Sequence, residues 1–212
     1  MLDAARLPLF VVASISLLLI PGPAVLYVIT RSIHQGRRAG IVSMMGLHVG
    51  TLFHVTAAAL GLSAILVSSA LAFSVVKLLG AGYLIYLGVR TLMTREETAE
   101  ADAVRPASLR RVFSQGVVVN VLNPKLALFF FAFLPQFADS TRGAVGLQML
   151  LFGLLFIGMG MITDSSYALL AGTLGGWLRR SRTFARFRRY VAGTIYIGLG
   201  LTLAVSASAN EG

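Results

Sequence analysis

The chain has 212 residues, of which 57% are hydrophobic and 12% are charged, and its mean hydropathy is +0.82. Soluble domains carry about a quarter of charged residues, so half that fraction excludes an ordinary soluble domain and indicates a membrane protein. The absence of cysteine from the sequence excludes disulfides, thiolate nucleophiles and cysteine metal sites.

Long apolar blocks divide the chain into predicted spans. A bilayer core of about 30 Å needs about 20 helical residues, so the blocks predict an all-α membrane protein with six transmembrane helices. The second block is long enough for two helices, with a turn near Ser68–Ser69. The first block lacks the cleavage site of a signal peptide, and we expect it to be a retained span. In chain order, the blocks cover residues 7–29, 39–89, 112–137, 143–178 and 190–209.

Basic residues gather in three of the predicted loops. Of the 18 Lys and Arg residues, 14 lie between predicted spans one and two, three and four, and five and six. The positive-inside rule then places these loops in the cytoplasm and both termini outside. The net charge of +10 is explained by this topology signal and by contact with anionic lipid headgroups. No nucleic-acid partner is expected.

A cytoplasmic linker is predicted at residues 94–111, where the sequence is mixed in charge and contains Pro106. It divides the single transmembrane domain of residues 1–212 into two halves, 1–93 and 112–212. Each half holds three predicted spans, and an odd number of spans forces the halves into opposite orientations. The sequence therefore predicts a 3+3 inverted-topology repeat.

The first predicted span is interrupted by Pro21, Gly22 and Pro23. Because proline has no backbone N–H, Pro21 and Pro23 cannot donate to the carbonyls of Leu17 and Leu19. Carbonyls freed in this way cannot face lipid, so they need a helix, water or a ligand. An ordinary proline kink is the alternative interpretation.

The fourth predicted span contains a second interruption, in which Pro124 cannot donate to the carbonyl of Asn120. Asn123 and Lys125 flank this proline. Proline-interrupted spans at corresponding positions of two halves point to a transporter site near the bilayer midplane. Asn120 and Asn123 share a helix face, whereas on an ideal helix Lys125 points away from it, unless the break redirects the lysine.

Ionisable residues inside predicted spans are costly and are candidates for function. Asp164 is the only carboxylate within a predicted span, and it lies on a ridge of small residues in span five. A desolvated carboxylate is a natural proton carrier. Lys125 needs an anion or a carbonyl as its partner. The sequence leaves open whether it pairs with Asp164 or with the substrate.

Four further residues are secondary candidates for the substrate or ion pathway. His48 and His54 lie six residues apart and so do not share a helix face as a metal-binding pair would. His54 is either a core histidine bonded to a neighbour or part of a proton relay. Lys77 is near the external end of span three, where snorkelling to the interface explains it. Tyr83 lies in the same span.

Several stretches in order resemble one family of transporters. They are "PGP" in the first span, "GRRAGIVSMMGLHVG" entering the second, "KLLGAGYLIYLGVR" in the third and "FSQGVVVNVLNPK" with "FFFAFLPQF" in the fourth. Together they resemble the LysE/RhtB family of amino-acid exporters (threonine, homoserine and lysine efflux type) over roughly residues 8–205. Family members often have asparagine after PGP, where this chain has Ala24.

The resemblance implies a multi-pass carrier of the bacterial inner membrane that exports amino acids, driven by the proton motive force. It also implies that residues 21–23 and 123–125 correspond to the family's two central motifs. The expected partners are an amino acid and protons, with no cofactor and no metal. Small-residue faces would permit a homodimer.

The sequence leaves three other classes of function open. A cation or metal exporter would need clustered oxygen or nitrogen ligands, and a passive channel would conduct without a proton gradient. An intramembrane enzyme would need a nucleophile–base pair or a metal motif, and the sequence has no such spacing.

Overall fold

The computed structural model describes residues 6–20, 22–62 and 106–178, together with single helical positions between residues 75 and 93 and between 190 and 205. Side chains in the last helix are described up to Ala171. Every regular element in these ranges is a helix, and the described residues form no strand. The predicted all-α fold is confirmed for this part of the chain.

The first predicted span is two helices, α1 (Leu7–Leu19) and α2 (Pro23–Gln35), which meet at an angle of 51°. Pro23 occupies the first turn of α2, where its missing N–H costs nothing. The predicted interruption is therefore confirmed. Helix α2 continues six residues beyond the predicted apolar block, to Gln35, and is followed by Gly36, whose φ is +83°.

The fourth predicted span is broken in the same way, with a bend of 47° between its two parts. The first part is α6 (Leu109–Val121), whose N-terminus is capped by the Ser108 side chain. Its first three residues belong to the predicted linker of residues 94–111. The second part starts at Pro124. It consists of α7 (Pro124–Leu128), the π-helix η2 (Phe129–Phe133) and the 3-10 helix η3 (Leu134–Phe137).

Two helices are unbroken and apolar enough to cross a membrane. They are α3 (Arg37–Ala57), which continues into the π-helix η1 (Ala58–Leu62), and α8 (Val145–Leu178). The short η4 (Ser140–Arg142) precedes α8. The described ranges thus hold two spans, or four when each bent pair counts as one. The turn predicted near Ser68–Ser69 lies outside the described residues.

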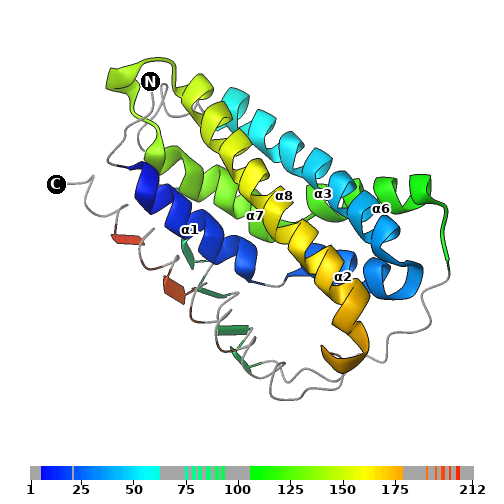
Figure 1. The fold of residues 1–212 in the computed structure, drawn as a ribbon. Coiled ribbons are helices and arrows are strands. Elements are labelled where there is room, and N and C mark those ends of the chain that lie inside the picture. The colour runs from blue at the N-terminus through cyan, green and yellow to red at the C-terminus, as the bar shows by residue number, and fades with distance from the viewer. Residues whose placement is uncertain are drawn as a thin grey trace.

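Helix α3 packs along both α6 and α8, and Figure 1 shows α3 and α8 side by side along the length of the molecule. Glycines allow the close approach. A Cβ on Gly116 would lie 2.7 Å from the carbonyl oxygen of Ser43, and one on Gly46 would meet the carbonyl oxygen of Phe113. A methyl group at either position would force the α3 and α6 backbones apart.

We expect Gly46→Ala to lower the free energy of unfolding by about 1–3 kcal/mol, because the α6 backbone cannot move aside as a flexible side chain could. Thermal unfolding of the purified protein in detergent measures the loss. Gly158→Ala is the matched control, since nothing lies within 4 Å of a Cβ at that position. Equal melting temperatures for the two variants would contradict this account of the α3–α6 contact.

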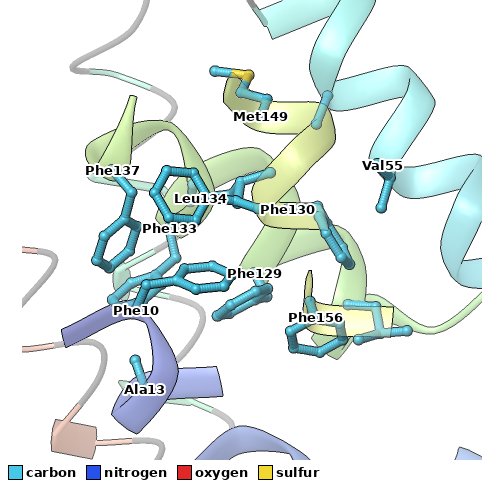
Figure 2. Packing of buried hydrophobic residues seen from close by; sticks show 14 of the residues in the cluster. Phe10, Ala13, Val55, Phe129, Phe130, Phe133, Leu134, Phe137, Met149 and Phe156 are labelled. Atoms are coloured by element: carbon cyan, nitrogen blue, oxygen red, sulfur yellow. The ribbon is translucent and has the colours of Figure 1, made fainter. Parts of the chain in front are cut away.

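A cluster of aromatic rings joins α1, η2, η3 and α8 (Figure 2). Phe10 lies 4.7 Å from Phe152 and 5.2 Å from Phe137 between ring centroids, and Phe156 lies 4.8 Å from Phe129. Each such pair contributes roughly 0.5–1.5 kcal/mol beyond the burial of its area. This cluster fixes α1 and the second half of the broken fourth span against α8, on one side of the two breaks.

The distribution of polarity fits a lipid environment. Large apolar side chains are exposed along the spans, such as Phe53 at 60% and Ile162 at 71%, while ionisable ones are buried. Asp164 and Lys125 are only 6% and 8% exposed. A soluble protein keeps such groups on its surface, so the interior of this bundle is where its polar chemistry lies.

Candidate functional site

The carbonyls freed by the first break are bound by side chains from other helices. The Lys125 ammonium donates to the carbonyl of Leu17 at 2.7 Å and to that of Ile20 at 2.9 Å. The Tyr167 hydroxyl, from α8, donates to the carbonyl of Leu19 at 3.1 Å. The end of α1 is thereby tied to both α7 and α8.

At the second break, hydrogen bonds involve side chains of α3 and the two asparagines of the break itself. His54 Nε2 lies 3.0 Å from the freed carbonyl oxygen of Asn120, so this nitrogen carries the proton. The Asn120 amide donates at 2.7 Å to both the Leu47 carbonyl and the Thr51 hydroxyl. The Asn123 side chain caps α7 by accepting from the backbone N–H of Lys125 at 3.1 Å. His54 is therefore buried and bonded to a neighbour, and its part in a proton relay stays a prediction.

Asp164 faces His48 across the α3–α8 contact. The carboxylate Oδ2 is 3.3 Å from His48 Nε2, close enough for an ion pair when the histidine is protonated. The two atoms are not aligned as a hydrogen bond, and neither ring nitrogen of His48 has a hydrogen-bond partner among the described residues. The imidazole also packs against Gly160, where a Cβ would lie 2.7 Å from its Cε1.

The sequence left open whether Lys125 pairs with Asp164. In the structure the lysine ammonium donates to two α1 carbonyls, and the Asp164 carboxylate lies close to His48. Pairing of Lys125 with Asp164 or with substrate stays a prediction. The break explains how the lysine reaches α1. On an ideal helix Lys125 points away from the face of Asn120, but the 47° bend turns α7 so that the lysine reaches the end of α1.

A pocket of about 40 Å³ lies where the two breaks meet. That volume holds about three water molecules, since each needs roughly 10–15 Å³ by this measure. Its lining combines ionisable and apolar side chains. The polar lining is His48, Thr51, Asn120, Asn123, Lys125 and Asp164, and the rest is Leu17, Leu18, Gly22, Ala24, Val25, Leu126 and Phe156.

The structure brings most of the predicted site residues to this pocket. Gly22, Asn120, Asn123, Lys125, Asp164 and the secondary candidate His48 line it directly. Pro23 and Pro124 begin the helices on its border, whereas His54 lies one layer behind, against the Asn120 carbonyl. Pro21, Lys77 and Tyr83 fall outside the described residues.

Comparison with known proteins identifies the family. Residues 15–207 match the family described as LysE type translocator. The chain belongs to this family. It is a membrane transporter rather than an enzyme.

Several bacterial relatives align over almost the whole length of the chain. An uncharacterized membrane protein of Vibrio cholerae is 29% identical, with 89% of this chain and 91% of the relative aligned. A homoserine/homoserine lactone efflux protein of Salmonella typhimurium is 29% identical over 92% of this chain and 94% of its own. A leucine efflux protein of Salmonella typhimurium is 26% identical over 94% of both chains. No solved structure matches.

Two features of this LysE family member lie outside the predicted site residues. They are Tyr167 and a cluster around Arg31. Tyr167 is three residues after Asp164 on α8, so helical periodicity could have placed it on the same face. Arg31 was counted with the loop arginines because the first span was predicted to end at Ile29. It is instead 7% exposed, within α2.

A metal site would need several ligands in one place. Within the described residues, no three His, Asp or Glu side chains come close enough together to hold a metal ion. The ionisable groups of the pocket are one carboxylate, one imidazole and one ammonium, a set that suits a zwitterion and a proton better than a metal cation.

Proposed function

We propose that this LysE family transporter exports an amino acid or a close derivative from the cytoplasm and is driven by the proton motive force. The observation that supports this most is the pocket between the two broken spans, which places a carboxylate and cationic groups around one small cavity. An amino acid presents the complementary pair of charges. The names of two relatives, a homoserine/homoserine lactone and a leucine efflux protein, agree with a substrate of this class.

The amino group of the substrate binds at Asp164 in this proposal. The side chain is buried, lines the pocket and lies within ion-pair distance of the His48 imidazole. The α-carboxylate binds at the first turn of α2, where Ala24 and Val25 border the pocket beside the positive charge of Lys125. The opening N–H groups of a helix have no acceptor within it and favour an anion.

In this proposal the Asp164 carboxylate binds either the substrate ammonium or a proton, and this competition couples export to proton movement. A proton taken up by Asp164 from the outside weakens its hold on the ammonium, so the amino acid leaves and the proton moves inward. The two broken spans rock about the pocket to expose it to each side in turn. Because the spans contain no second carboxylate, a neutral amino acid fits better than a doubly cationic one such as lysine.

The membrane topology in this proposal is six spans, with an inverted repeat and both termini outside. Two bent spans at corresponding positions support the repeat. Polar contacts at the two ends of the bundle join segments that this topology places on the same side. Arg6 donates to the carbonyls of Gln136 and Ala138 at one end, and Gln35 donates to the carbonyl of Ala107 at the arginine-rich other end.

Amino-acid profiling of cells that overexpress the chain tests the export function. We expect one or a few neutral amino acids to accumulate outside and to fall inside, and collapse of the proton gradient to stop this. Efflux that persists without a gradient would indicate a passive channel instead. Resistance of the cells to a metal salt, with an unchanged amino-acid profile, would indicate a metal exporter.

A further inference from the structure

Arg31 is buried, unlike the other described arginines at the arginine-rich end of the bundle. Arg37 and Arg38 are exposed, as a topology signal should be, whereas Arg31 is buried. It lies on α2 seven residues beyond Ala24, which lines the pocket. Seven helical residues are two turns, or about 10 Å. A charged group is thus held inside the bundle between the pocket and the cytoplasmic end.

The partners of the Arg31 guanidinium are all uncharged. It donates to Gln35 Oε1 at 2.6 Å and to Gln115 Oε1 at 2.8 Å, and its central carbon lies 5.4 Å from the centre of the Tyr27 ring. Among the described residues no carboxylate is within ion-pair distance of it. Arginine cannot give up its proton, and a buried charge is costly unless an opposite charge compensates it. Within the ranges that the structure describes, Arg31 therefore has no anionic partner of the kind its chemistry favours.

Two hydrogen bonds of neighbouring side chains join α2 to the α6 region without the guanidinium. The Tyr27 hydroxyl donates to the Val112 carbonyl at 2.7 Å, and Gln35 binds the backbone just before α6. These two links join α2 to α6 independently of Arg31. Gln115 can therefore leave the arginine without releasing the helix pair.

We propose that Arg31 is a docking site on the cytoplasmic side for the α-carboxylate of the exported amino acid, occupied before the substrate reaches the central pocket. This rests on the export function proposed above and adds a second binding step to it. The planar guanidinium binds a carboxylate through two parallel hydrogen bonds. The carboxylate replaces Gln115, a neutral acceptor, and then moves two helical turns along α2 to the first turn of that helix.

Transport measured from each face of the membrane tests the docking site. The probes are radiolabelled L-leucine and L-homoserine, in inside-out vesicles for the cytoplasmic face and in right-side-out vesicles for exchange from the other face. We expect Arg31→Gln to raise the KM at the cytoplasmic face by about tenfold, the effect of losing one charge-assisted contact. The maximal rate and the KM at the opposite face should not change, and Arg31→Lys should restore part of the affinity.

Two further variants separate docking from a structural role. Arg38→Gln removes the same charge from the exposed surface of the same end and should leave both KM values unchanged. Gln115→Leu removes the neutral competitor of the carboxylate and should leave the cytoplasmic KM unchanged or lower it. If Gln115→Leu instead raises the cytoplasmic KM as Arg31→Gln does, the arginine only links two helices and the proposal of a docking site is wrong.

The remaining outcomes also decide the question. Equal changes of KM at both faces, or a lower maximal rate alone, would overturn the docking site while leaving the export function standing. A lipid phosphate could supply the same anion chemistry, and in that case the effect of Arg31→Gln would disappear in vesicles reconstituted without anionic lipid. Failure of the wild-type chain to move any amino acid would overturn the export function itself, and the wild-type measurement reveals this first.

Discussion

Asp164→Asn should abolish export driven by a proton gradient while leaving the fold intact. Asparagine has nearly the same shape as aspartate, but it carries no charge for the substrate ammonium and takes up no proton. Truncating one partner of a buried charge pair costs about 2–5 kcal/mol, so we expect at least a roughly 30-fold fall in transport rate. Proteoliposomes with an imposed pH gradient measure this directly.

Asp139→Asn is the matched control for this experiment. Asp139 lies in the short connection before α8, where its carboxylate accepts from the Thr141 hydroxyl and N–H. The hydrogen bonds from Thr141 hold the pKa of the Asp139 carboxyl below its usual range. Asp139 lies before the start of α8 and does not line the pocket, so transport should stay at the wild-type level. An Asp164→Asn protein that still transports at the wild-type rate under a pH gradient would remove this residue from the coupling step.

The sequence predicted the two breaks because proline and glycine act locally. A missing N–H frees a carbonyl four residues earlier whatever surrounds it, and both bends lie at the predicted positions. The close packing of α3 was also predictable, since Gly46, Gly50 and His54 recur every four residues. Local sequence alone produces the freed carbonyls and the small-residue face of α3.

The partners of the freed carbonyls could not be predicted, because they depend on how the helices bend and meet. Lys125 reaches the end of α1 only after the 47° turn at Pro124. His48 meets Asp164 because Gly160 leaves room for the imidazole. The burial of Arg31 depends on α2 continuing past the apolar block to Gln35, which hydropathy alone does not predict.

The largest structural effect should come from Lys125→Met. Methionine keeps much of the length of the side chain but leaves the Leu17 and Ile20 carbonyls without their lysine donor. An unsatisfied buried acceptor costs about 1–3 kcal/mol, and inside a membrane bundle little water is present to replace the lysine. We expect a lower melting temperature in detergent together with loss of transport, in contrast to Asp164→Asn, which should lose transport alone.

Tyr167→Phe provides a graded comparison for the lysine variant. It removes one neutral hydrogen bond, to the carbonyl of Leu19 in the same break, and should cost only about 1 kcal/mol. If both variants lose the same stability, Lys125 does not hold the break closed, and its charge then serves the substrate alone. If Lys125→Met unfolds far more readily, the two carbonyls at the end of α1 are a cation site that the protein fills with its own ammonium.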